Sequence, residues 1–292
     1  MHKPFFRHKV TSKNCLVFCT VSIVCLQLLY ASTLIAQGNL MITPRRVVLE
    51  GQHKTQELNL ANMGKDSARY LISMLEIRMK SDGTFEQISI PDSGQHFSSN
   101  YIRFFPRSVA LGPGEAQTVK IQITGQNEMA PGEYRSHIYF RAVPEERPLG
   151  EKEPYKDTSG ISVHLVPIFG ISIPVIIRVG ESTSAVTLSN TAFERLHNDT
   201  PVLNMVFNRS GNMSVYGDLK IDFISPQGKT TRVGEIKGIA VYTPTSSRSI
   251  RVTLDNTRGI DYKAGKLHVM YTTSSDAKSV LKLAETELAL FN

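Results

Sequence analysis

Apolar and polar residues alternate along most of the chain after residue 36. The longest example is ISVHLVPIFGISIPVIIR, residues 161–178, in which every odd position from Ile161 to Ile177 is apolar. We call these odd positions the apolar row. A period of two is typical of a β-strand. At about 3.3 Å per residue, eighteen residues would extend roughly 55 Å, against about 20 Å for an ordinary strand. The apolar row is therefore longer than the core of a small domain requires.

Shorter segments with the same period lie on both sides of this row, separated by turn signals such as KSDGT and LGPGEA. Candidate strands before the row are residues 40–50, 55–62, 68–80, 84–90, 100–105, 117–125 and 132–143. Candidates after it are residues 184–189, 201–208, 217–224, 229–236, 248–254, 265–273 and 280–290. No long segment has helical spacing. The pattern predicts an all-β protein made of β-sandwiches.

The length of 292 residues suits two domains of ordinary size. The strands fall into two series, and the sequence Val179-Gly180-Glu181-Ser182 separates them. We therefore expect a first domain over residues 37–180 and a second, smaller β-sandwich over residues 181–292, with a hinge between them.

The first 36 residues differ from the rest of the chain. Lys3, Arg7, Lys9 and Lys13 precede an apolar run from residue 15 to Ala36, and no acidic residue is present. This arrangement predicts a secretory signal peptide over residues 1–36. An uncleaved membrane anchor is the alternative, because about 20 apolar residues can span a bilayer, but scattered polar residues dilute the run.

Composition changes once the signal peptide is set aside. All three cysteines, Cys15, Cys19 and Cys25, lie in it, so the mature chain can form no disulfide and no thiolate metal site. Four of the 33 basic residues also leave, and 29 against 26 acidic residues gives a net charge of +3. Basic and acidic residues are interspersed, which does not favour nucleic-acid binding.

The mature chain lacks the residue patterns of an enzyme. It contains no G-x-S-x-G, no glycine-rich phosphate loop after a strand and no H-E-x-x-H. No two histidines stand at a metal-ligand spacing; they are His53, His96, His137, His164, His197 and His268. We expect no catalytic residues, no metal, no cofactor and no small-molecule substrate.

Two further motifs are informative. TPRRVVLEG, residues 43–51, places Arg45 and Arg46 in an early strand. They are either surface arginines or, near a cleft, guanidinium groups that hold a carboxylate through two parallel hydrogen bonds, and spacing does not decide between these. FFPRSVALGPGEAQTVKI, residues 104–121, predicts a core hairpin.

In this order behind a signal peptide, TPRRVVLEG, FFPRSVALGPGEAQTVKI and the long alternating strand resemble the periplasmic pilus-assembly chaperones of the PapD-like family, from residue 40 to about 180. The resemblance implies two immunoglobulin-like domains set as an L. It also implies a non-enzymatic periplasmic protein that lends a β-strand to fimbrial or pilus subunits whose own sandwich lacks one (donor-strand complementation). An outer-membrane usher would be a second partner.

The resemblance also assigns roles to particular residues. Arg46 matches the anchor for the subunit's terminal carboxylate, and Arg178 matches an arginine that bridges to the second domain, with Asp261 as its best partner. The strand-lending positions are Ile161, Val163, Leu165, Pro167, Phe169 and Ile171.

The chain departs from the family pattern at three points. Pro174 stands where the family has a lysine beside the anchoring arginine. An expected acidic residue aligns with Arg135, which leaves Glu133 as a substitute, and no cysteine pair staples the second domain. These departures indicate a divergent branch. The alternative function is a structural or adhesive cell-envelope protein, in which the apolar row would be covered by its own fold or by copies of itself.

Overall fold

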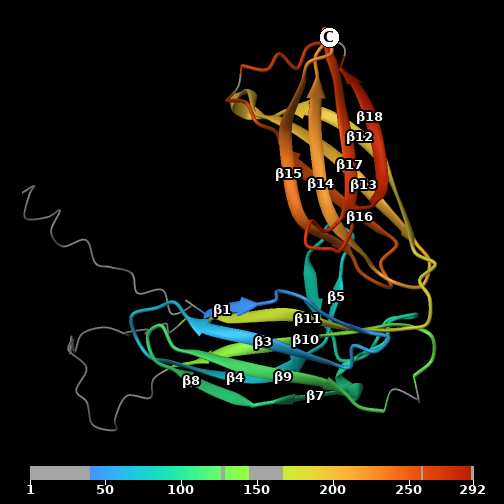
Figure 1. Ribbon diagram of the computed structural model, residues 1–292. Coiled ribbons are helices and arrows are strands. Elements are labelled where there is room, and N and C mark those ends of the chain that lie inside the picture. Colours follow the sequence, from blue (N-terminus) through green and yellow to red (C-terminus); the bar gives the residue numbers. More distant parts are fainter. Residues whose placement is uncertain (1–39, 126–128, 145–166, 258, 291–292) are drawn as a thin grey trace, which may run out of the picture. The chain divides into compact units, whose positions relative to one another are not determined.

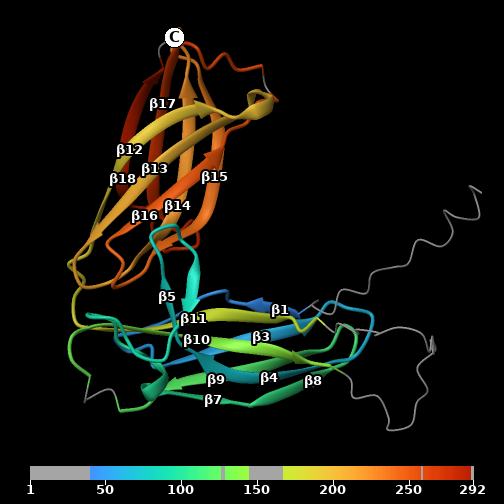
Figure 2. The same ribbon diagram turned by 180° about the vertical axis from the view of Figure 1, so that it is seen from behind.

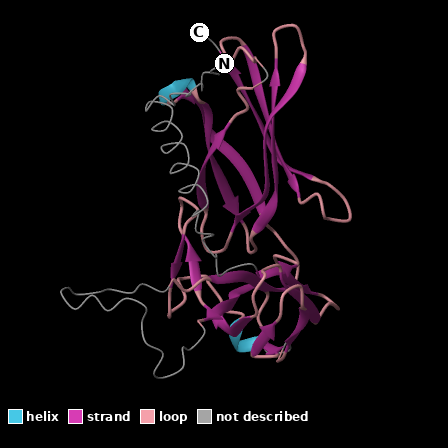
Figure 3. Cartoon of the chain, turned by 90° about the vertical axis from the view of Figure 1, so that its left-hand side faces the viewer, coloured by secondary structure: helices cyan, strands magenta, loops and turns pink. Residues whose placement is uncertain are grey.

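The computed structural model describes residues 40–125, 129–144, 167–257 and 259–290 (Figure 1). The predicted signal peptide lies outside the described residues. Three residues of the apolar row, Ile161, Val163 and Leu165, also lie outside them. Strands dominate the described part, and its two helical segments are single 3-10 turns, Ser99–Tyr101 and His197–Asp199 (Figure 3). The predicted all-β class is confirmed.

Nine strands in two sheets form the first sandwich, which uses the first part of the chain. One sheet has the order β1 (Leu40–Thr43), β3 (Thr55–Asn62), β9 (Ala116–Ile123) and β7 (Ile102–Phe105). The other has the order β2 (Val47–Glu50), β11 (Gly170–Val179), β10 (Gly132–Val143), β4 (Ala68–Leu75) and β8 (Ser108–Leu111). In Figures 1 and 2, β11 is the yellow strand beside the green β10.

The core of the first sandwich forms where the apolar positions of the two sheets face each other. Leu58 and Val119 from one sheet and Ile138 and Val175 from the other have no exposed surface. Complete burial of a side chain of this size stabilises the fold by about 1.5–3 kcal/mol relative to exposure. The alternation read from the sequence therefore corresponds to this layer.

The second sandwich uses the rest of the chain. Its three-stranded sheet has the order β12 (Ala185–Arg195), β13 (Pro201–Ser210) and β16 (Ser247–Thr253). Its four-stranded sheet has the order β15 (Thr230–Val241), β14 (Val215–Ile224), β17 (Gly265–Thr273) and β18 (Lys282–Leu290). Phe207 and Tyr271 meet edge to face in its core, with ring centroids 5.0 Å apart.

A short hairpin belongs to neither pair of sheets. It consists of β5 (Ile77–Met79) and β6 (Phe85–Gln87), which pair only with each other. Its backbone bonds to the second sandwich, because the Thr245 hydroxyl donates to the Met79 carbonyl at 2.6 Å and the Ser249 N–H donates to the Ser81 carbonyl at 2.7 Å. The hairpin thus links the two sandwiches at a point remote in sequence from the chain connection after β11.

Three of the predicted strands differ in the structure. Residues 68–80 form β4 and β5, which belong to different sheets. Residues 40–50 form two strands, because the chain leaves one sheet after Thr43 and joins the other at Val47. The strand predicted from residue 161 is described only from Gly170, and residues 167–169 are not in a strand.

Candidate functional site

The outer edge of β11 is only partly occupied. The Ala142 N–H donates to the Phe169 carbonyl at 2.9 Å, and β10 and β11 pair antiparallel from there to Val179. Because backbone groups alternate between the two edges of a strand, odd residues of β11 bond to β10 and even residues point to the opposite edge. On that edge β2 covers only Val175 to Arg178. Within the described residues, nothing pairs with Gly170 and Ser172 there.

Side chains of β11 follow the same alternation. Ile173, Val175 and Ile177 lie in the core of the first sandwich, and Ile171 packs against it. The chain's own core therefore covers the apolar row from Ile173 to Ile177. Ile171 is only partly buried, and its assignment to a partner-facing surface stays a prediction.

The residues directly before β11 are more exposed to solvent than the strand itself. Pro167 is exposed, and Phe169 retains 46% of its surface. Phe169 also lines an apolar pocket of about 100 Å³ at the end of the first core, with Leu40, Tyr70, Phe140, Gly170 and Ile171. The exposed apolar positions thus lie directly before β11.

Arg46 immediately precedes β2, on the same edge of the sheet. Its guanidinium carbon lies 4.2 Å from the centroid of the Tyr216 ring, in a cation–π contact. The Nε and Nη2 atoms are enclosed and have no hydrogen-bond partner in the described part of the chain. Burial lowers the pKa of Arg46 because the cation has lost water. Arg45, in contrast, is exposed.

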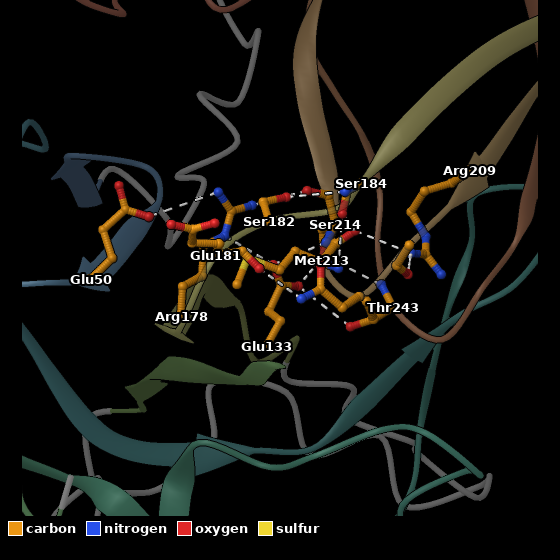
Figure 4. Close-up of polar contacts among 12 residues, drawn as sticks. Glu50, Glu133, Arg178, Glu181, Ser182, Ser184, Arg209, Met213, Ser214 and Thr243 are labelled. Atoms are coloured by element: carbon orange, nitrogen blue, oxygen red, sulfur yellow. Dashed lines mark hydrogen bonds and ion pairs between the residues drawn. The ribbon is translucent and has the colours of Figure 1, made fainter. Parts of the chain in front are cut away.

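Arg178 lies at the end of β11 within a polar cluster (Figure 4). Its Nε donates to the Glu133 carboxylate at 3.1 Å, and its Nη2 donates to the Ser214 carbonyl of the second sandwich at 2.9 Å. Glu133 is buried and also accepts hydrogen bonds from the Ser214 N–H at 3.0 Å, the Ser214 hydroxyl and the Thr243 hydroxyl. One carboxylate therefore joins β10, β11 and the second sandwich.

The predicted partner of Arg178 is wrong. Asp261 is exposed, and its carboxylate accepts a hydrogen bond from the Lys263 N–H at 3.0 Å. Arg178 reaches the second sandwich through a backbone carbonyl, and its acidic partners are Glu133 and, at 3.9 Å, Glu50. Glu133, which the sequence left as an uncertain substitute, occupies the acidic position.

Arg135 is a buried cation that sequence reasoning did not place in a site. It has 1% of its surface exposed, and its guanidinium carbon lies 4.5 Å from the centroid of the Tyr242 ring. Only Nη2 has acceptors, the carbonyls of Ile77 at 3.3 Å and Thr243 at 3.4 Å. The Nε and Nη1 atoms are buried without partners in the described residues. Burial lowers the pKa of Arg135, and the neighbouring charge of Arg46 lowers it further.

His137 is opposite Pro174 in the register of β10 and β11. Burial, and secondarily the charge of Arg135, lowers the pKa of His137 to about 3. The imidazole is therefore neutral at pH 7 and does not supply the positive charge that a lysine at position 174 would bring.

The site thus combines an unpaired strand edge with two enclosed guanidinium groups. These elements suit the binding of extended polypeptide and of a carboxylate. Across the described residues, no three His, Cys, Asp or Glu side chains are grouped as metal ligands. The same residues include no helix with the length and apolar character needed to cross a membrane.

Comparisons with known proteins give a likeness of fold. No protein-family model and no curated protein sequence matches the chain. Among solved structures, the YadV chaperone is 12% identical over 86% of this chain and 100% of its own, with a TM-score of 0.43. The Pseudomonas aeruginosa CupB2 chaperone is 12% identical over 86% and 100%, with a TM-score of 0.41. A chain from the complex of Salmonella enterica SafA pilin with the SafB chaperone is 13% identical over 86% and 96%, with a TM-score of 0.38. At such values the likeness carries no argument about function, which has to come from the chain's own residues.

Proposed function

We propose that this chain is a periplasmic chaperone, a divergent member of the PapD-like family, that binds fimbrial or pilus subunits by lending them a β-strand. The observation that carries the proposal is the edge of β11 at Gly170 and Ser172, with which no described residue pairs, in line with β2 and directly before Arg46. An open edge is a template for one more strand, and proteins normally cover or interrupt it.

The position of Arg46 selects the direction of the added strand. β2 runs parallel to β11, with Val47 opposite Val175. A partner strand that continues this line in the same direction ends beside Arg46, so that its terminal carboxylate meets unpaired guanidinium donors. A strand of the opposite direction would bring its terminal ammonium group to the same cation. Charge therefore favours the parallel orientation.

The first part of the apolar row supplies the side chains for the partner. We assign six odd positions to the groove left by the missing strand of a subunit: Ile161, Val163, Leu165, Pro167, Phe169 and Ile171. Burial of four Leu- or Ile-sized side chains contributes about 6–12 kcal/mol before the cost of ordering the two chains. Arg46 then sets the register, because a shift of one residue would turn all these side chains out of the groove.

The proposed role involves no chemical step. The chaperone would hold each subunit until an outer-membrane usher takes it into a surface fibre. The predicted signal peptide is the feature that supports a periplasmic location.

Capture of the natural partner tests the proposal. The tagged full chain, purified from the periplasm of its own cells, should bring down a smaller β-rich polypeptide at a ratio of one to one. Leu165→Asp should abolish this capture without unfolding the chaperone, and Arg46→Ala should weaken it. Equal capture by all three proteins would contradict the proposal.

A further inference from the structure

Two arginines of the first sandwich have an unusual and similar environment. Each guanidinium lies over the ring of a tyrosine from the second sandwich. Arg46 lies over Tyr216 of β14, and Arg135 lies over Tyr242, which directly follows β15. In the part of the chain that the structure describes, each also has two enclosed nitrogen atoms without an acceptor, Nε and Nη2 of Arg46 and Nε and Nη1 of Arg135. A buried donor that lacks a partner destabilises the fold, and does so more strongly when it is charged. Two such groups in one region need an explanation.

The nearby acidic side chains do not provide the missing acceptors. Glu133 already accepts from Arg178, Ser214 and Thr243, as described above. Glu76 exerts an attraction on Arg135 that raises its pKa, but it forms no hydrogen bond or ion pair with it, and its Oε2 is itself unpaired. The free donors of Arg135 are therefore available to a ligand.

Arg209 shows what a structural arginine looks like in the same molecule. It is also buried, and its donors are all directed at carbonyl groups. Nε donates to Thr245 O at 2.9 Å, Nη1 to Gly211 O at 2.8 Å and Met213 O at 3.1 Å, and Nη2 to Pro244 O at 3.4 Å. Among the described residues, Arg135 has acceptors for Nη2 alone.

We infer that Arg135 is the second cation of the carboxylate site, in place of the lysine that Pro174 replaces. The ligand is the terminal carboxylate of the extended polypeptide that pairs with β11, so the inference rests on the proposed function. Arg46 receives this carboxylate at the end of the strand edge through Nε and Nη2, which lie on one edge of its guanidinium, and Arg135 adds a second positive charge and one further donor from β10.

Access to Arg135 passes the β5–β6 hairpin. The Ile77 carbonyl of β5 accepts from Arg135, and Phe85 of β6 contacts the rings of His137 and Tyr242, with centroids 5.8 and 6.3 Å from its own. Phe85 is half exposed. Binding of a carboxylate at Arg135 requires this hairpin to shift, because Arg135 has only 1% of its surface exposed.

A pair of peptides tests the inference. The probe is a fluorescein-labelled seven-residue peptide of alternating valine and threonine, made once with a free terminal carboxylate and once with a terminal amide. The mature chain should bind the acid at least about tenfold more tightly than the amide, because hydrogen bonds to a charged group contribute roughly that factor or more. Arg135→Met should reduce this ratio about tenfold, and Arg135→Lys should reduce it less.

Stability measurements separate a positioning residue from a structural one. Urea unfolding of Arg135→Met should show an unchanged or higher midpoint, since the substitution removes a buried unpaired charge. Arg209→Met, the matched control, should lower the midpoint and leave the preference for acid over amide unchanged.

The outcomes distinguish this inference from the proposed function. If Arg46→Met loses the preference for the acid and Arg135→Met retains that of the unsubstituted chain, Arg135 is not part of the site while the proposed function stands. If the unsubstituted chain shows no preference for the acid, the carboxylate anchor of the proposed function fails, and the inference fails with it.

Discussion

Arg178 and Glu133 lie directly opposite each other in β11 and β10, and their side chains form an ion pair of 3.1 Å. The Glu133 side chain has no exposed surface, and it also binds the backbone N–H and hydroxyl of Ser214. The attachment of β11 to the second sandwich is thus made by a carboxylate that the first sandwich supplies.

We predict that Glu133→Gln lowers the free energy of unfolding by about 3 kcal/mol, because it removes the charge of a buried ion pair while it leaves Arg178 in place. Urea denaturation would measure this. Glu287→Gln is the control, since the Lys266–Glu287 pair at 2.9 Å is exposed and its loss should cost less than about 1 kcal/mol. If both substitutions change the free energy of unfolding by the same amount, the buried ion pair stabilises the fold no more than an exposed one, which would contradict the prediction.

The sequence determined the layers of the first sandwich well. Leu58, Val119 and Ile121 alternate with exposed polar neighbours, and all three are buried as a period of two requires. The alternation did not predict which strands lie at the edge of a sheet, or where the chain passes from one sheet to the other. The break between β1 and β2 depends on which sheet each half joins, and no local pattern encodes that choice.

The candidate site was predicted in part. Arg46 was singled out by its motif, whereas Tyr216, Tyr242 and Arg135 were not. Arg135 lies in a segment of β10 that is buried on both faces from Gly132 to Ile138. Alternation cannot reveal such a segment, because the second face is covered by residues more than 70 positions away, such as Thr243.

A second prediction concerns pH. The pKa of His137 is lowered to about 3 in the folded chain, against about 6.5 when unfolded. The unfolded state therefore binds more protons between these values, and stability falls as pH decreases from 6.5 towards 3. His137→Gln should remove up to about 3 kcal/mol of the loss between pH 7 and pH 4.

Unfolding in urea at both pH values would check this, with His53→Gln as a control at an exposed position. An equal loss of stability for His137→Gln and the unsubstituted chain would contradict a neutral buried imidazole.

A third prediction is that the two ends of the apolar row respond differently to substitution, because only the end that contains Ile177 lies in the core of the first sandwich. Ile177→Ala should lower the free energy of unfolding by about 2–5 kcal/mol, since Ile177 is fully buried in the first core. Leu165→Asp should leave the urea midpoint of the free chain unchanged and abolish capture of the partner. If Leu165→Asp unfolds the free chain, this part of the row also belongs to the core, and it cannot be the surface that meets a subunit.

A fourth prediction uses proline on neighbouring residues of β11. Ser172→Pro removes an N–H that points to the unpaired edge, so the free chain should fold and should no longer pair with a partner strand. Ile171→Pro removes an N–H that points to β10, so it should destabilise the free chain by about 3 kcal/mol or more. Circular dichroism and capture assays would show both effects. Normal capture by a folded Ser172→Pro chain would show that this edge is not used.

The central claim is that a partner strand pairs with the open edge of β11, and amide exchange measured residue by residue tests it most directly. In the free chain, NMR should show fast hydrogen exchange at Gly170 and Ser172 and slow exchange at Ile171 and Ile173, which bond to β10. In the complex with the captured subunit, Gly170 and Ser172 should exchange at least about tenfold more slowly. Unchanged exchange at these two amides in a stoichiometric complex would contradict the claim.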